Sequence, residues 1–178
     1  MTRSNTFTLL NTPTLWFYVP YLAPLQAELS LLDENNLEID TIQFELPSQP
    51  GIIGVKLPSI PEVNRRYRWV FSLICNPDVP ALNITIGGVI QQVRFTSEDV
   101  APDWIEFSET HRSYDAIRTQ IFNLEEMGIW YDILTAVGTR YFRTPANATI
   151  AEDWNALLES ANLDAYRDIP IVAIYSEN

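Results

Sequence analysis

The sequence predicts an α+β protein in which an antiparallel β-sandwich of the immunoglobulin or fibronectin type is followed by a helical subdomain. Two observations predict this class. Over the first half of the chain, short apolar stretches are separated by Pro, Asn and Gly turns at the spacing typical of a sandwich, roughly every 8 to 12 residues. After residue 96, the apolar residues recur at helical spacing. We therefore expect a sandwich over 6–95, a helical subdomain docked on it over 96–170, and a C-terminal tail over 171–178.

Composition restricts the class of partner. The 178 residues are 47% hydrophobic and 12% aromatic, as in a packed globule, and carry a net charge of −12. Such a charge repels phosphate backbones, so nucleic acid is a poor partner. Residues 97–178 hold five Lys/Arg against fifteen Asp/Glu, a net −10. A solvated helical surface explains this acidity, and a basic partner is the alternative.

Targeting signals are not evident in the sequence. No apolar run approaches the roughly 20 residues needed to span a bilayer, so we expect no membrane insertion. The segment "MTRSNTFTLL" lacks the apolar core and cleavage site of a signal peptide. If Met1 is the natural start, we expect a cytoplasmic protein.

The first long strand, "PTLWFYVPY" (13–21), is apolar on both faces. Alternation along a strand puts Leu15, Phe17 and Val19 on one face. The opposite face then carries Trp16 and Tyr18. We expect the first face to fill the sandwich core and the second to meet the C-terminal helices, because those helices must bury their own apolar stripes.

The other strands follow in order. Expected strands are 26–33, 37–46, 52–57, 66–75 and 82–95, with "ENN" as the turn between the first two. Tyr67 opens the strongest strand, where a tyrosine corner would tie it to the preceding loop. Gly87 and Gly88 predict a bulge or bend that divides the last strand.

Three helical segments are expected in the second half. The stretch 108–127 is helical in pattern, and a second helix follows Gly128 with Ile129, Ile133 and Val137 on its apolar face. This pair weakly resembles one tetratricopeptide unit, with Trp130 after the turn and Pro145 ending the second helix. In the third helix, Thr149 is the expected N-cap, with Glu152 completing a capping box. Its apolar stripe is Ile150, Trp154, Leu157 and Leu158.

Four segments together resemble a known family. They are "PTLWFYVPY", "YRWVFSLICNP", "GIWYDIL" and "DWNALLESANL". In this order they resemble the signature segments of cyanobacterial domain-of-unknown-function family 928 (DUF928), over roughly residues 11–170. The resemblance implies that a signal peptide and a basic Gly/Arg-rich stretch commonly precede the domain, which makes an extracytoplasmic location the alternative. It provides no catalytic residue that could be assigned to this sequence.

No assembled catalytic or metal site is expected. His111 is the only histidine and lies in a polar segment, while Cys75, the only cysteine, lies in an apolar run and is expected to be a buried, inert thiol. Zinc sites rich in histidine are therefore impossible, and no Gly-rich phosphate loop precedes a helix. We expect no cofactor, no metal and no enzymatic activity.

Carboxylates offer a weaker alternative, because paired acids support glycoside hydrolysis. The candidates form two groups, Asp103, Glu106 and Glu109 in one and Asp33, Glu34 and Glu38 in the other. Nothing in the sequence marks a desolvated cleft around either group, so we interpret both as solvated charge. The second group also resembles a fragment of a calcium loop, but it lacks the required glycine.

Aromatic and cationic side chains provide the candidate interaction surface. Its members are Trp16, Tyr18, Tyr21, Arg66, Arg68 and Trp130. Such side chains form protein hot spots or stack on sugars. We expect a non-catalytic protein-interaction or scaffolding module, and the alternative is a carbohydrate-binding or glycan-processing protein. The expected partner is another protein, with a glycan as the second choice.

Overall fold

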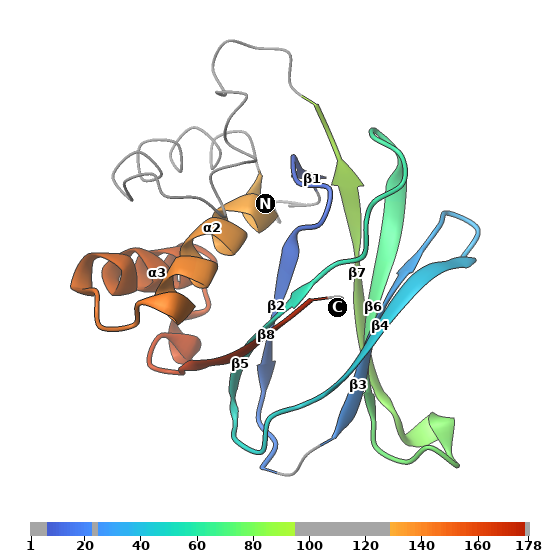
Figure 1. Cartoon of the computed structure of the whole chain (residues 1–178), viewed down its shortest axis with the longest axis horizontal. Helices are drawn as coiled ribbons and strands as arrows, with labels where there is room; N and C mark the ends of the chain where they lie inside the picture. Colours follow the sequence, from blue (N-terminus) through green and yellow to red (C-terminus); the bar gives the residue numbers. More distant parts are fainter. Residues whose placement is uncertain (1–6, 23–24, 95–128, 177–178) are drawn as a thin grey trace.

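The computed structural model describes residues 7–22, 25–94 and 129–176, which form two β-sheets and a helical layer (Figure 1). One sheet has five strands in the order β1-β7-β6-β3-β4, and the other has three in the order β2-β5-β8. The five-stranded sheet contains β1 (Phe7–Thr8), β3 (Gln26–Leu32), β4 (Glu38–Glu45), β6 (Arg66–Ile74) and β7 (Ile84–Gln92). The three-stranded sheet contains β2 (Thr14–Val19), β5 (Gly51–Lys56) and β8 (Ile171–Tyr175). The α+β class is confirmed.

The two sheets share a core, and their strands lie over one another. Phe17 of β2 stacks on Phe71 of β6, with ring centroids 4.2 Å apart. Tyr175 of β8 stacks on Phe44 of β4 at 4.3 Å, and its hydroxyl donates a hydrogen bond of 2.7 Å to the Glu45 carbonyl. Since β5 lies between β2 and β8, it faces β3. The three-stranded sheet therefore covers β6, β3 and β4, and no strand of it lies over β7.

Two strand pairs are parallel, which corrects the expectation of a purely antiparallel sandwich. β1 pairs with β7, and β8 pairs with β5, in parallel register. The second pairing also corrects the expected tail: residues 171–175 form the outer strand of the three-stranded sheet. The apolar sequence "IVAIY" explains this, because its side chains pack against both hydrophobic cores.

β2 is buried on both faces over most of its length, as expected. Leu15, Phe17 and Val19 belong to the core between the sheets. Trp16 packs instead into the second core, between the three-stranded sheet and the helices, with its ring centroid 5.5 Å from that of Trp154. Figure 1 shows both helices on this side of the three-stranded sheet. The helices therefore cover the outer face of β2. The fold has three layers: the five-stranded sheet, the three-stranded sheet and the helices.

β7 is one continuous strand, so the bend expected at Gly87 and Gly88 is wrong. Its register with β6 runs without a shift from Ile84 to Gln91. A β-carbon at Gly88 would lie 2.5 Å from the Trp69 ring, which rests on this position from the neighbouring strand. Gly88 therefore makes room for an indole ring.

Two α-helices are described. α2 (Trp130–Arg143) and α3 (Ala148–Ser160) bury the expected stripes, including Ile129, Ile133 and Val137, which are fully buried. The N-cap of α3 is Asn147, whose side chain accepts a hydrogen bond from the Ile150 amide at 3.2 Å, and not Thr149. The expected helix over 108–127 lies outside the described residues, so the tetratricopeptide-like pair stays untested.

Candidate functional site

An apolar groove of about 420 Å³ opens between β2, β7 and the helical layer. We call it the β2–β7 groove. One wall is the run of β2 and the segment after it, residues 16–21. The others come from the inner faces of β6 and β7 and from α2, α3 and the short 3₁₀ helix η4 (Asp164–Tyr166). The lining side chains are Trp16, Phe17, Tyr18, Val19, Pro20, Tyr21, Ile52, Phe71, Leu73, Ile84, Ile86, Leu134, Trp154, Leu158, Leu163 and Tyr166.

The groove lies where the described residues leave the inner face of β7 partly exposed, at Ile84 and Ile86. Ile84 and Ile86 point to the same face as Ile90, since alternate residues of a strand share a face. Ile90 is fully buried, whereas Ile84 and Ile86 are 45% and 50% exposed. The smaller sheet ends at β2, over β6, and leaves these two isoleucines open to solvent.

Three of the predicted surface residues meet in this groove: Trp16, Tyr18 and Tyr21. Tyr18 is 43% exposed, and its ring lies 5.2 Å from that of Tyr166. Trp16 also lines the groove and is partly buried, with its ring next to that of Trp154. Trp16 thus meets the helices as expected, whereas Tyr18, two positions later on the same face, contacts Tyr166 but stays partly exposed.

The other predicted residues lie elsewhere. Arg66 and Arg68 are exposed and alternate along β6 with the buried Tyr67, so they lie on the outer face of the larger sheet. Arg68 donates a hydrogen bond to Asn36 of the β3–β4 turn. Trp130 is partly buried at the start of α2, against the second core. The six residues do not form one surface.

Sequence reasoning missed Ile84, Ile86, Leu163 and Tyr166. The alternation in "LNITIGGVI" places the two isoleucines on the core side, and it does so correctly. No local sequence pattern indicates that the facing sheet lacks the strand that would cover them. Leu163 is the N-cap of η4 and Tyr166 is its last residue. So short a helix has no apolar stripe at helical spacing, so periodicity could not identify either residue.

Among the described residues, no charged side chain lines the groove, but its helical border is acidic. Residues 148–168 hold five carboxylates, Glu152, Asp153, Glu159, Asp164 and Asp168, against one arginine, Arg167. This gives a local net charge of −4. Arg167 forms ion pairs with Glu159 at 3.4 Å and with Asp164 at 3.9 Å. Beside the groove, Glu159 and Asp164 share this one cation, so a ligand would meet apolar contacts next to a small excess of negative charge.

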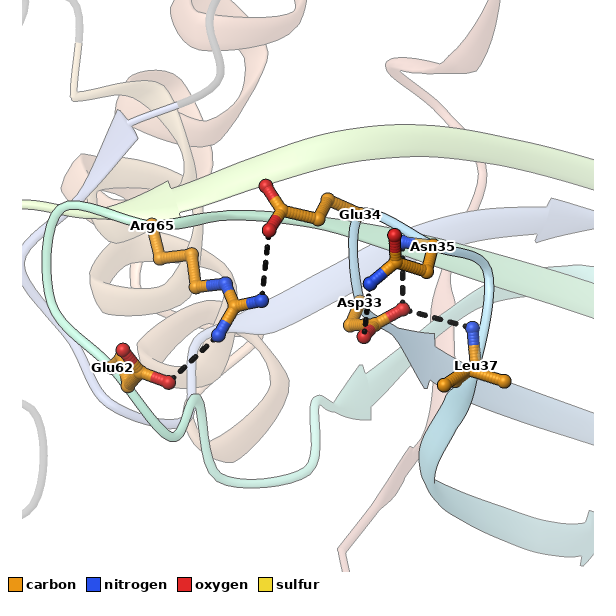
Figure 2. Close-up of polar contacts among 6 residues, drawn as sticks. All are labelled: Asp33, Glu34, Asn35, Leu37, Glu62 and Arg65. Carbon is orange, nitrogen blue, oxygen red and sulfur yellow. Dashed lines mark hydrogen bonds and ion pairs between the residues drawn. The ribbon is translucent and has the colours of Figure 1, made fainter.

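The carboxylates at the β3–β4 turn have structural contacts (Figure 2). Asp33 accepts hydrogen bonds from the amides of Asn35 at 2.8 Å and Leu37 at 2.9 Å, which closes the turn. These bonds, that from Leu37 above all, lower the pKa of Asp33 and so favour its ionised form. Glu34 pairs with Arg65 at 2.9 Å, and Arg65 also pairs with Glu62 at 2.8 Å. This arrangement disfavours a general acid at Asp33.

A buried carboxyl at the start of α2 is the most perturbed acid of the described chain. Asp132 accepts hydrogen bonds from the Thr8 hydroxyl and from the Leu9 amide, the latter at 2.7 Å, and so attaches β1 to α2. Desolvation by burial raises the pKa of Asp132 to about 7. Asp132 does not line the β2–β7 groove. We interpret it as a structural anchor.

The expected burial of Cys75 is wrong. Cys75 follows the last residue of β6 and is exposed, and its amide donates a hydrogen bond to the Asn83 side chain at 3.2 Å. The apolar run "WVFSLIC" leaves the sheet one residue earlier than its composition suggests. His111 and the acids Asp103, Glu106 and Glu109 lie outside the described residues. Within residues 7–22, 25–94 and 129–176, no group of three or more His, Cys, Asp or Glu side chains is placed to hold a metal.

A second groove, also of about 420 Å³, lies beside α2 on the opposite end of β2. Its lining includes Lys56, Arg143 and the hydroxyl residues Thr12, Thr139 and Ser176. This groove mixes polar and apolar side chains and includes two basic residues, in contrast to the β2–β7 groove. None of the six predicted surface residues lines it.

Comparison with known proteins decides the family. The family model of the Domain of Unknown Function DUF928 matches residues 2–171, nearly the whole chain. The chain belongs to the DUF928 family. No curated protein and no solved structure matches this DUF928 chain. In the described part of the DUF928 protein, neither helix combines the length and the apolar character required to cross a bilayer.

Proposed function

We propose that this DUF928 protein is a non-catalytic protein-interaction module that binds its partners through the β2–β7 groove. The observation that carries the proposal is the open, uncharged groove bordered by exposed Tyr18, Ile84 and Ile86. Exposed apolar surface of this kind marks interaction sites, because its removal from water stabilises a complex. The aromatic residues of the β2 wall are of the type that dominates binding energies at protein interfaces.

The sandwich of this proposal is of the immunoglobulin type, and the strand order supports it. In that topology one sheet contains strands G, F, C and C′ in order, and the other contains B and E. β7, β6, β3 and β4 follow the first order, and β2 and β5 are the second pair. Tyr67 is buried at the start of β6, the F-like strand, where a tyrosine corner belongs. β8 then stands beside the E-like strand.

Two charge variants on one strand test the proposal. Ile86→Asp places a carboxylate in the groove, whereas Val89→Asp places it on the opposite face of β7, at a residue that is also exposed. Affinity capture from a lysate of the encoding organism should retain the same partners with wild type and with Val89→Asp, and should lose them with Ile86→Asp. Partners that survive Ile86→Asp would assign binding to another surface, and an absence of any enriched partner would contradict the proposal. Circular dichroism establishes that both variants fold.

Glycan binding is the second proposal, and one contact favours it. The rings of Tyr18 and Tyr166 lie 5.2 Å apart at the border of the groove, and an exposed aromatic ring of this kind can stack on a sugar face. Glycan-array binding that is abolished by Tyr18→Ala and retained in Ile86→Asp would favour this function over protein binding.

A further inference from the structure

We propose that the occupant of the β2–β7 groove is an extended peptide segment with basic flanks, which adds as a strand to the free edge of β2. This inference rests on the proposed function and names how the groove recognises a protein partner. Four features of the described residues carry it: the free backbone groups of β2, the uncovered face of β7, the length of edge that remains open, and the charge of the border.

The unpaired backbone groups of β2 can be assigned from its register. In an antiparallel pair, alternate residues direct both backbone groups toward the partner strand. The Leu57 amide donates to the Pro13 carbonyl at 2.8 Å, so the odd-numbered residues of β2 face β5. The even-numbered residues face the other way, and the Thr14 amide indeed bonds to the Thr135 hydroxyl of α2 at 2.9 Å. The backbone groups of Trp16 and Tyr18 therefore point along the open edge, into the groove.

A strand added at this edge would lie over β7. β2 lies over β6, as the Phe17–Phe71 stack shows, and neighbouring strands are about 4.8 Å apart. β7 is the neighbour of β6 on this side. The added strand would therefore cover Ile84 and Ile86 and would complete the smaller sheet where it is one strand too short. Every second side chain of the segment would contact these isoleucines, so the segment needs apolar residues at alternate positions.

The fold limits the length of this edge. At one end, Thr14 already bonds to Thr135 through both its amide and its carbonyl, the latter at 3.3 Å. At the other end, Pro20 has no amide hydrogen to donate. The remaining edge offers the two N–H and two C=O groups of Trp16 and Tyr18, which suits a segment of about five residues.

Charge complementarity specifies the flanks of the segment. On the α3–η4 border, Glu159 and Asp164 are neighbours of the lining residues Leu158 and Leu163 and pair with Arg167, whereas none of the described lining residues is charged. These two carboxylates share that single cation and keep more than half of their side chains exposed. A Lys or Arg just outside the apolar positions of the segment would therefore meet the remaining negative charge, and an acidic segment would be repelled.

Selection from a peptide library tests the inference. The probe is a phage-displayed library of random twelve-residue peptides, panned on the whole chain. We expect enriched sequences to alternate apolar residues over about five positions and to carry Lys or Arg at the flanks. Failure to enrich any sequence, or enrichment of acidic or helical-period sequences, would overturn the inference.

A main-chain test separates strand addition from other modes of binding in the same groove. The best selected peptide is synthesised in two forms that are N-methylated at alternate residues, so that each form loses the amide hydrogens of one edge only. One form should bind at least about tenfold more weakly than the parent, and the other should bind like the parent. Equal binding of both forms, together with loss in Ile86→Asp, would overturn strand addition and leave the groove as an interaction site. Equal binding by Ile86→Asp, Val89→Asp and wild type would overturn both proposals.

Two other occupants have their own readouts. A second copy of the chain in the groove would give a dimer in sedimentation equilibrium that Ile86→Asp disperses and the peptide displaces. Residues 1–6 of the same chain would act as a competitor, so their removal would tighten peptide binding at least about tenfold. Either result would overturn the assignment of the groove to a separate partner segment. The assignment is supported if the protein is a monomer and its peptide affinity does not change when residues 1–6 are removed.

Discussion

The indole ring of Trp16 lies so close to Gly138 that a β-carbon at position 138 would come within 2.5 Å of it. On the neighbouring strand, a β-carbon at Gly54 would lie 3.0 Å from the same ring. The ring thus occupies a slot between β5 and α2 that two glycines leave open, with Trp154 at its edge. This contact joins the sandwich to the helices.

Trp16→Ala should lower the free energy of unfolding by about 3 to 5 kcal/mol, because rigid neighbours fill the resulting cavity only in part. This is a large share of the roughly 5 to 15 kcal/mol of a typical domain. Urea denaturation measures the change. Tyr18→Ala, on the same face of the same strand but exposed, is the matched control and should cost less than about 1 kcal/mol. A loss below about 1 kcal/mol for Trp16→Ala would contradict the assigned packing.

Gly138→Ala should destabilise the protein by about 1 to 3 kcal/mol, although alanine is the better helix former, because the added methyl group overlaps the Trp16 ring. In the Trp16→Ala background the same substitution should cost clearly less, because only the Trp154 ring, 2.9 Å from the added β-carbon, then remains in the way. A double-mutant cycle in urea measures this coupling. Additive effects of the two substitutions would show that the ring and the glycine do not touch.

The buried Asp132 should make stability depend on pH. Burial raises its pKa in the folded state from 3.8 to about 7, so the folded state holds this proton more tightly than the unfolded state does. The protonated carboxyl therefore makes its full contribution to the free energy of unfolding below about pH 4, and this contribution is lost as the pH rises through about 7. At about 1.4 kcal/mol per pKa unit, the loss is on the order of 4 kcal/mol.

The Asp132→Asn variant isolates this effect, because the amide does not titrate. Urea denaturation at pH 4.5 and at pH 8 gives the free energy of unfolding of both proteins. The wild-type value minus the Asp132→Asn value should be larger at pH 4.5 than at pH 8. Asp78→Asn, at an exposed turn, controls for the overall negative charge. If the wild type gained stability over Asp132→Asn as the pH rose, the folded carboxyl would have a lowered pKa instead.

The exposed thiol of Cys75 should react fully with an aromatic disulfide reagent in the native protein, without denaturant. Cys75→Ser should change the free energy of unfolding by less than about 0.5 kcal/mol, as is usual for surface substitutions. Absorbance of the released thiolate gives the stoichiometry. A thiol that reacts only after addition of urea would show that Cys75 is buried, as the apolar sequence around it predicts, and would contradict its exposure in the structure.

Local patterns predicted most of the strands and the burial of the described helices. The two-faced burial of β2 followed from alternation, and the stripe of Ile129, Ile133 and Val137 followed from the helical period. Asp33 to Asn36 form the expected hairpin turn, in which Asn36 takes the left-handed conformation at φ 62°. Each of these features depends on residues close together in the sequence.

The features that sequence reasoning missed depend on distant residues. β8 has the composition of a strand, but its partner lies more than a hundred positions earlier, so nothing near it in the sequence announces the pairing. Gly88 resembles a bulge glycine until Trp69 is seen to rest on it. The β2–β7 groove reflects a mismatch in size between two sheets, which no single strand encodes.

The pairing of β8 with β5 also constrains how the chain can assemble during synthesis. It joins Ile171 to Ile52, so the smaller sheet remains incomplete until almost all of these 178 residues have left the ribosome. Until then, the growing chain carries an unpaired edge at β5, and such edges invite contact with other chains. Closure of so long a loop is also slow. Newly made chains should therefore depend on chaperones more than the size of the protein alone would suggest.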